Sequence, residues 1–210
     1  MTTTTKTDTR DATRIIACRV FKPALEQLRL ARRYPDLRIS YLPPVLHTRP
    51  TQLEQHFRRR VAMAARRRER LVCLYGDCFP DIGEFCRLRG IAKIPEKTCY
   101  EILLGTDLFG RLLDETAGTY FLERELILNF REYCAEPLEL YDEQMRKWCF
   151  EHYQRLLYVR QPGDPDLVPR ACELADFLEL ALEIRDADYS HLERRLVELL
   201  QSGRRGIPSP

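Results

Sequence analysis

Glycine is scarce in this chain, and its scarcity excludes several classes of function at the outset. Only nine of the 210 residues are glycine, about 4% against a usual value of about 7%. The sequence has no GxGxxG, GxxxxGK[ST] or GxSxG pattern, so we expect no dinucleotide, nucleoside triphosphate or serine hydrolase site built on such loops. The HExxH pattern of zinc proteases is absent as well.

Long apolar runs are also missing. No segment approaches the roughly 20 consecutive apolar residues that cross a bilayer, and the polar N-terminal stretch lacks the apolar centre of a secretory signal. Hydrophobic residues make up 44% of the chain and the formal net charge is only +2, which excludes a highly charged disordered protein. We therefore expect a soluble, cytoplasmic protein with no membrane span.

Short apolar runs alternate with amphipathic segments along the chain. Strands are predicted at residues 14–21, 37–42, 71–75, 91–94, 118–122, 156–159 and 181–184. Helices are predicted at residues 22–34, 51–68, 82–88, 99–116, 125–133, 141–155, 168–178 and 189–200. This alternation is typical of an α/β fold with a mainly parallel sheet flanked by helices, in Rossmann-like or flavodoxin-like layering. We predict one domain over residues 14–202, with disordered tails at residues 1–13 and 203–210.

Thiol and imidazole groups follow the first four predicted strands. Cys18, His47, Cys78 and Cys99 come one after each strand, at spacings of 29, 31 and 21 residues. Ligands of an open parallel sheet bind outside the carboxyl ends of its strands. The sequence therefore predicts that these four side chains face one pocket.

The predicted pocket has the donor atoms of a metal site. Three thiolates with one imidazole suit zinc, and three thiolates with an open position suit an iron–sulfur cluster. Asp77 and Glu101 are the nearest carboxylates for proton transfer, so they are the candidate catalytic residues. Tyr75 and Tyr100 are expected at the mouth of the pocket, as candidate cofactor-binding residues.

The remaining cysteines and the basic residues have simpler interpretations. Five of the eight cysteines are predicted to lie in the core: Cys73, Cys86, Cys134, Cys149 and Cys172. Seven arginines give one predicted helix a basic outer face: Arg58, Arg59, Arg60, Arg66, Arg67, Arg68 and Arg70. Aromatic residues do not alternate with them, so a solvated helix face is favoured over a nucleic-acid site.

Two alternatives to a metal enzyme stay open at this point. In the first, the protein is not an enzyme but delivers a metal or cofactor to a partner, and the arginine-rich helix is its docking surface. In the second, no metal is bound and one cysteine acts as a nucleophile with His47 as its base.

Five phrases carry a resemblance to a known family. In chain order they are ACRVF, YLPPVLHTRP, LYGDC, TCYEILLG and GTYFL, and they contain Cys18, His47, Cys78 and Cys99. Together they resemble the family named domain of unknown function 1638, over about residues 14–200. Members often have glycine where Phe79 stands here, and a tryptophan-containing segment of theirs is replaced by ELILNF. The rim of the pocket is expected to differ accordingly.

The resemblance implies a context and no defined reaction. The family occurs in bacteria and archaea and is associated with anaerobic one-carbon and corrinoid-linked methyl metabolism. It implies a metal or corrinoid-type cofactor in a cysteine-rich pocket, and a small molecule or a corrinoid or methyl-transfer protein as partner. Methyl or sulfur transfer is the corresponding expected chemistry.

Overall fold

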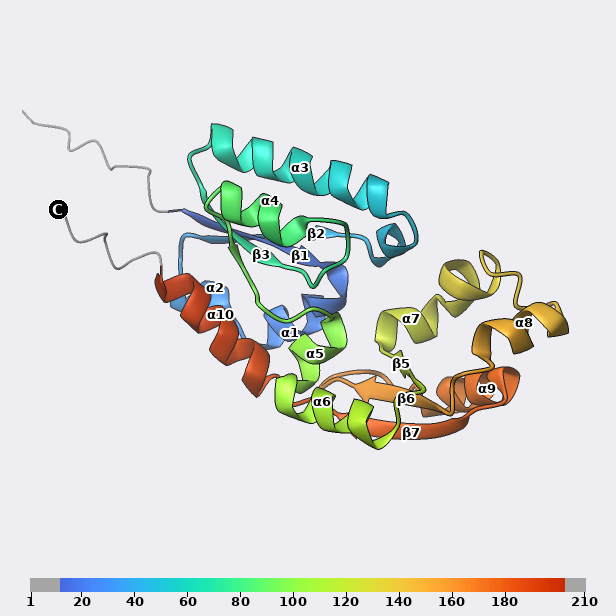
Figure 1. Ribbon diagram of the computed structural model, residues 1–210. Helices are drawn as coiled ribbons and strands as arrows, with labels where there is room; N and C mark the ends of the chain where they lie inside the picture. Colours follow the sequence, from blue (N-terminus) through green and yellow to red (C-terminus); the bar gives the residue numbers. More distant parts are fainter. Residues whose placement is uncertain (1–11, 203–210) are drawn as a thin grey trace, which may run out of the picture. The chain divides into compact units, whose positions relative to one another are not determined.

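The computed structural model describes residues 12–202, which form two compact units. Unit 1 contains residues 12–95 and 195–202, and unit 2 contains Glu96–Arg194. Each unit has an all-parallel sheet flanked by helices (Figure 1), which confirms the α/β class. The predicted tails lie outside the described residues except for Ala12 and Thr13, and Thr13 already belongs to the first strand. Among residues 12–202, no helix combines the length and hydrophobicity that crossing a bilayer requires.

The sheet of unit 1 has four parallel strands in the order β2-β1-β3-β4. The strands are β1 (Thr13–Cys18), β2 (Leu37–Leu42), β3 (Arg70–Leu74) and β4 (Ala92–Lys93). The last four residues of β1 are buried, as expected for an apolar run covered on both faces. In the register, Cys18 pairs with Leu42 and Ala17 with Leu74. Cys18 at the end of β1 is therefore the neighbour of Tyr75, which follows β3.

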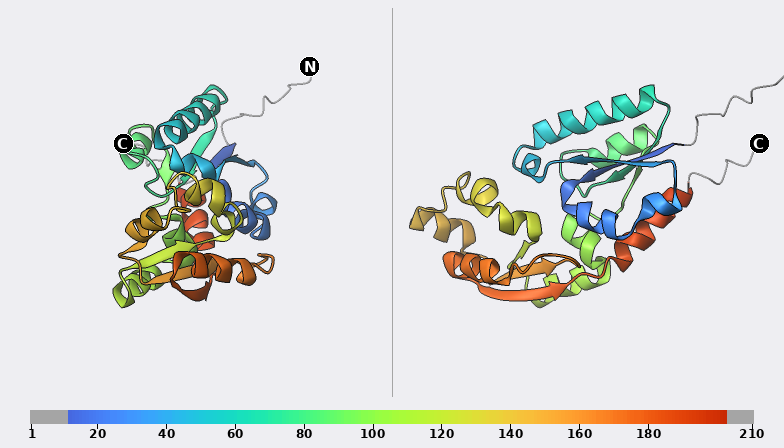
Figure 2. Two further views of the ribbon diagram at one scale, coloured as in Figure 1. Left: turned by 90° about the vertical axis from the view of Figure 1, so that its right-hand side faces the viewer. Right: turned by 180° about the vertical axis from the view of Figure 1, so that it is seen from behind.

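Helices cover both faces of the unit 1 sheet. The elements are the 3-10 turns at Arg19–Phe21 and Pro44–Thr48, α1 (Lys22–Gln27), α2 (Leu30–Arg33), α3 (Pro50–Arg66), α4 (Ile82–Leu88) and, from Arg195 onward, α10 (Ser190–Ser202). α3 and α4 lie on one face and α1, α2 and α10 on the other (Figure 1), and Figure 2 shows the same two layers from behind. The helix predicted over residues 22–34 is divided in two because Arg29 has a φ of 47°, which a right-handed helix does not accommodate.

The sheet of unit 2 has three parallel strands in the order β5-β6-β7. They are β5 (Thr119–Leu122), β6 (Arg155–Arg160) and β7 (Ala181–Asp186). The buried guanidinium of Arg155 connects them: Nε donates to Thr119 Oγ1 at 2.8 Å, and Nη1 donates to Glu183 Oε2 at 3.0 Å. The strands predicted in the second half of the chain are confirmed, but they form a sheet separate from that of unit 1.

Most helices of unit 2 are shorter than predicted, and only α9 has the predicted bounds. They are α5 (Cys99–Leu104), α6 (Thr106–Glu115), α7 (Arg124–Leu128), a π-helical turn at Arg131–Ala135, α8 (Glu143–Phe150) and α9 (Val168–Leu178). Gly105 separates α5 from α6 with a φ of 84°, and a Cβ there would lie 3.2 Å from His191 Nδ1. In α8, Trp148 faces solvent with an exposure of 67%, whereas Phe150 is buried.

Candidate functional site

The carboxyl edge of the unit 1 sheet carries three of the four predicted ligands. The strand order reverses between β1 and β3, and ligands of open α/β sheets bind in the crevice at such a reversal. Cys18 ends β1 and is 1% exposed. His47 lies in the 3-10 turn after β2, with its ring centroid 6.1 Å from that of Tyr75. Cys78 is partly buried in the turn that follows β3.

Burial controls the protonation of these groups. Burial raises the pKa of the Tyr75 hydroxyl well above its usual value, and the nearby thiols of Cys18 and Cys78 act in the same direction. Burial also raises the pKa of Cys78 to about 11, against the opposing effect of the Lys93 ammonium. The pKa of His47 is lowered by burial, so its imidazole is neutral at pH 7. Its buried Nε2 atom has no hydrogen-bond partner within residues 12–202.

The predicted four-ligand metal site is not preformed. In the described part of the chain, no three His, Cys, Asp or Glu side chains stand close enough together to hold a metal ion. Cys18, His47 and Cys78 belong to unit 1, whereas Cys99 belongs to unit 2. Asp77, a candidate catalytic residue, is half-exposed and lies 3.1 Å from Lys93 Nζ in an ion pair.

Cys99 is the first residue of α5, and the predicted site residues beside it, Tyr100 and Glu101, make hydrogen bonds within the fold. Thr98 Oγ1 accepts a hydrogen bond from Glu101 N at 3.1 Å, and Glu101 Oε2 accepts one from Lys97 N at 2.8 Å. These bonds cap the first turn of the helix. The Tyr100 hydroxyl donates to the carbonyl of Phe121 at 2.9 Å. The predicted catalytic role of Glu101 and the predicted cofactor contact of Tyr100 stay predictions.

Removing the cap of α5 tests this interpretation. We expect Thr98→Ala to lower the free energy of unfolding by about 1 kcal/mol, because Glu101 N loses its acceptor. Urea unfolding of the purified chain measures the loss, and Thr98→Ser, which keeps the hydroxyl, is the matched control. A Thr98→Ala protein as stable as Thr98→Ser would contradict the capping role.

The cysteines predicted to lie in the core divide into three groups. Cys73 and Cys86 are fully buried in unit 1, which confirms their prediction. Cys134 and Cys149 are partly buried and pack against the core of unit 2. Cys172 is exposed, so its prediction is wrong. It lies on the outer side of α9, whereas Ala171 and Ala175 on the opposite side face the core.

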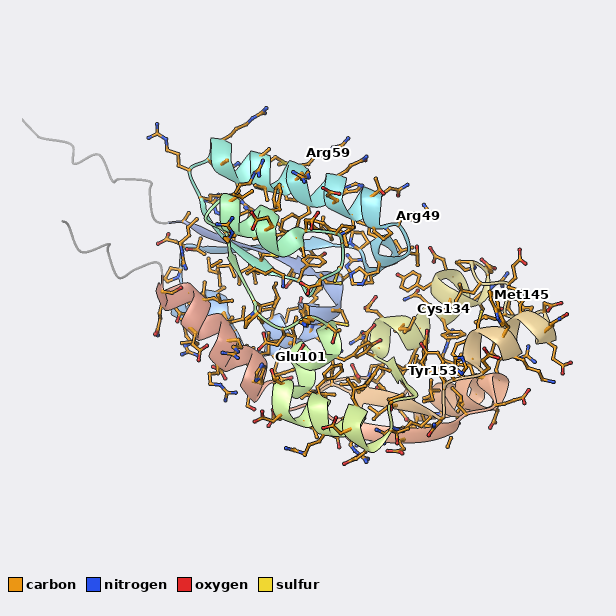
Figure 3. The ribbon with its side chains drawn as sticks, viewed as in Figure 1. Arg49, Arg59, Glu101, Cys134, Met145 and Tyr153 are labelled. Carbon is orange, nitrogen blue, oxygen red and sulfur yellow. The ribbon has the colours of Figure 1, made fainter. Side chains whose placement is uncertain are left out.

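The arginines of α3 mostly face solvent, as predicted. Arg59, labelled in Figure 3, is exposed on the outer side of α3. Arg70, predicted with them, is instead the first residue of β3, and its guanidinium donates to the carbonyls of Leu199 and Leu200 in α10. A cavity of about 470 Å³ lies between α3 and α4, where Arg58 and Arg89 both contact the ring of Phe85. Its lining includes none of the predicted metal ligands.

Two groups of polar residues in unit 2 were missed in the sequence. Glu96 Oε1 lies 2.7 Å from His191 Nε2, a pair separated by too many residues for any local pattern to reveal it. Glu123, Gln161 and Asp164 follow β5 and β6, at the carboxyl edge of the second sheet. Only their position directly after predicted strands could have indicated them, because the segment QPGDPD has the composition of an exposed turn.

Comparison with known proteins gives a family and no activity. No curated protein and no solved structure matches the chain. The family model described as protein of unknown function (DUF1638) matches residues 41–196. That match covers His47, Cys78 and Cys99, together with both polar groups of unit 2. The chain therefore belongs to the DUF1638 family.

Proposed function

We propose that the protein binds a thiophilic metal ion at the carboxyl edge of the unit 1 sheet, with Cys18, His47 and Cys78 as ligands. One observation carries the proposal: the neutral, buried His47 imidazole has no hydrogen-bond partner in the described chain. A buried polar nitrogen without a partner is costly, and a metal ion would satisfy it. The hydroxyl of the neighbouring Tyr75 is close to the thiols of both cysteines.

The donor set favours zinc over the other candidates. Two sulfurs and one imidazole nitrogen suit zinc and disfavour hard cations such as magnesium and calcium, which take oxygen ligands. Iron–sulfur clusters are usually held by four cysteine thiolates, whereas the proposed ligand set contains two. Side-chain rotation must bring the three donors together, since they are not grouped closely enough in the described residues. Cys18, His47 and Cys78 would hold the zinc ion, which would supply Lewis-acid activation of a thiol or water.

The metal-free cysteine nucleophile is less well supported. Cys18 is almost fully buried, so a substrate does not reach it. Cys78 is more accessible, but its pKa of about 11 keeps the thiol protonated at pH 7, and the thiolate is the reactive form. Metal binding would displace that proton, so we expect zinc affinity to rise with pH.

Metal analysis of matched variants tests the proposal. The full chain is purified without chelators under anaerobic conditions and analysed for zinc and iron, and Co²⁺ is added as a spectroscopic probe of thiolate ligation. We expect about one zinc per chain in the wild type and in Cys172→Ala, and its loss in Cys18→Ala, Cys78→Ala and His47→Ala. The exposed Cys172 is the control for removing any one thiol. Cys99→Ala tests the fourth ligand predicted from the sequence.

Two results would overturn the proposal. The first is a folded wild type that holds no metal and gives no thiolate-to-Co²⁺ absorption. The second is metal content that is unchanged in all three ligand variants. Circular dichroism of each variant separates a lost ligand from a lost fold.

A further inference from the structure

The carboxyl edge of the unit 2 sheet holds a connected group of buried and partly buried polar side chains. Asp164 Oδ2 accepts hydrogen bonds from the Tyr158 hydroxyl at 2.8 Å and from Gln161 N at 2.9 Å. Gln161 Oε1 accepts one from the Tyr189 hydroxyl at 3.2 Å. These residues come from β6, from the loop after it, and from the segment that follows β7. The network therefore joins the ends of neighbouring strands, where parallel sheets bind ligands.

Three buried atoms of this edge have no hydrogen-bond partner in the part of the chain that the structure describes. They are Arg124 Nε, Gln161 Nε2 and Asp164 Oδ1. Gln161 is only 2% exposed, so bulk water does not satisfy its amide. Buried polar groups in folded proteins almost always have a partner, and each exception requires an explanation. Two unpartnered donors and one unpartnered acceptor at one edge point to a bound molecule.

The three residues share one neighbourhood. The Tyr189 hydroxyl contacts Gln161. Leu122 of β5 pairs with Tyr158 of β6, so Arg124 and Gln161 follow the same ends of two neighbouring strands. Burial raises the pKa of the Tyr189 hydroxyl, Asp164 raises it further, and Arg124 opposes this. Glu123 is close to Asp164, but its own carboxylate accepts hydrogen bonds from Glu125 N and Leu126 N at the start of α7. Helix capping explains Glu123, so it is not needed as a ligand contact.

We infer that this edge binds a small organic acid that carries a hydrogen-bond donor next to its carboxylate, that is, an α-hydroxy or α-amino acid. The ligand carboxylate would accept from Arg124 Nε and Gln161 Nε2, and its hydroxyl or ammonium group would donate to Asp164 Oδ1. The Arg124 guanidinium supplies the positive charge that a carboxylate requires. This inference does not depend on the proposed metal ion, because all its residues belong to unit 2.

Ligand-observed NMR and calorimetry on the full chain test the inference. The probes are lactate, malate, alanine, serine and glutamate, and their matched controls are propionate, which lacks the donor, and lactamide, which lacks the carboxylate. We expect at least one of these hydroxy or amino acids to bind. Comparing the hydroxy acids with the amino acids shows whether the donor is a hydroxyl or an ammonium group. Its affinity should fall about ten-fold or more in Asp164→Asn and Arg124→Gln, because each change leaves a buried partner unpaired.

Asp176→Asn is the matched control, since it makes the same chemical change at an exposed position on α9. Its affinity should equal that of the wild type. Arg124→Gln lies at the start of a helix and removes no bond of the Asp164 network, which keeps the test valid if Asp164→Asn unfolds. Absence of binding in both probe series, or binding unchanged in both site variants, would overturn the inference.

Discussion

Replacing Glu69 with alanine is expected to lower the free energy of unfolding by about 3–5 kcal/mol at pH 7. The Glu69 side chain is 2% exposed and accepts hydrogen bonds from Arg14 Nε at 2.5 Å and from Arg14 Nη2 at 2.9 Å. Arg38 Nη1 adds a third bond at 3.0 Å. These residues lie at the amino ends of β1, β2 and β3, so one carboxylate holds three strands together. Without it, the largely buried Arg14 guanidinium is left uncompensated.

The stabilisation by Glu69 should disappear in acid. The hydrogen bond from Arg14 keeps the pKa of Glu69 below its usual value, and the charges of Arg14 and Arg38 add to the effect. A carboxylate whose pKa is lower in the folded state stabilises the fold above its unfolded pKa of about 4.3. That stabilisation is lost as the pH falls through the folded pKa. The difference in stability between the wild type and Glu69→Ala should therefore shrink progressively as the pH falls below about 4.

Urea unfolding at neutral and acidic pH measures both effects. Glu84→Ala is the matched control, because Glu84 pairs with Arg87 on the exposed surface of α4 and such pairs contribute little. It should unfold as the wild type does at each pH. A Glu69→Ala protein that loses less than about 1 kcal/mol at pH 7 would contradict the proposed role of the network.

Local sequence patterns located most elements of the fold, but long-range contacts set several of their limits. The strand Leu37–Leu42 and the helices Ile82–Leu88 and Val168–Leu178 have the predicted bounds, because breakers and apolar periodicity are local. At Gly105 the helix breaks with a φ of 84°, and His191, a residue far along the chain, lies where a side chain would begin. The division of the strands between two sheets likewise depends on which strands pair, and an alternating pattern does not encode that choice.

The candidate sites show the same limit. The sequence placed Cys18, His47 and Cys78 at one edge of the sheet because each follows a predicted strand, and the carboxyl ends of parallel strands lie at the same edge. Cys99 falls in the second unit, which begins at Glu96 without any local signal that marks its start, and its part in the site stays a prediction. Gln161 was missed because a segment rich in proline, glycine and aspartate is usually exposed. Its burial depends on Tyr189, which comes from beyond the next strand.

The contribution of Glu123 in unit 2 to stability should depend on pH in the opposite sense to that of Glu69. We expect Glu123→Gln to remove this pH dependence. Glu123 is 5% exposed. Burial raises the pKa of its carboxyl to about 7, although the hydrogen bonds from Glu125 N and Leu126 N act to lower it. A carboxyl whose pKa is higher in the folded state favours the fold below its unfolded pKa, and this contribution is lost as the pH rises through 7.

The shift from 4.5 to about 7 corresponds to a loss of about 3 kcal/mol between pH 4.5 and pH 8. Glutamine does not titrate and its amide oxygen still accepts one of the two backbone bonds, so Glu123→Gln should gain stability relative to the wild type by about that amount over the same range. Urea unfolding at pH 5 and pH 8 measures the difference, and the exposed Glu132→Gln is the control. If the free energies of unfolding of the wild type and Glu123→Gln changed with pH in the same way, Glu123 would already be charged in the folded protein at pH 5. The network at this edge would then carry the negative charges of both Glu123 and Asp164.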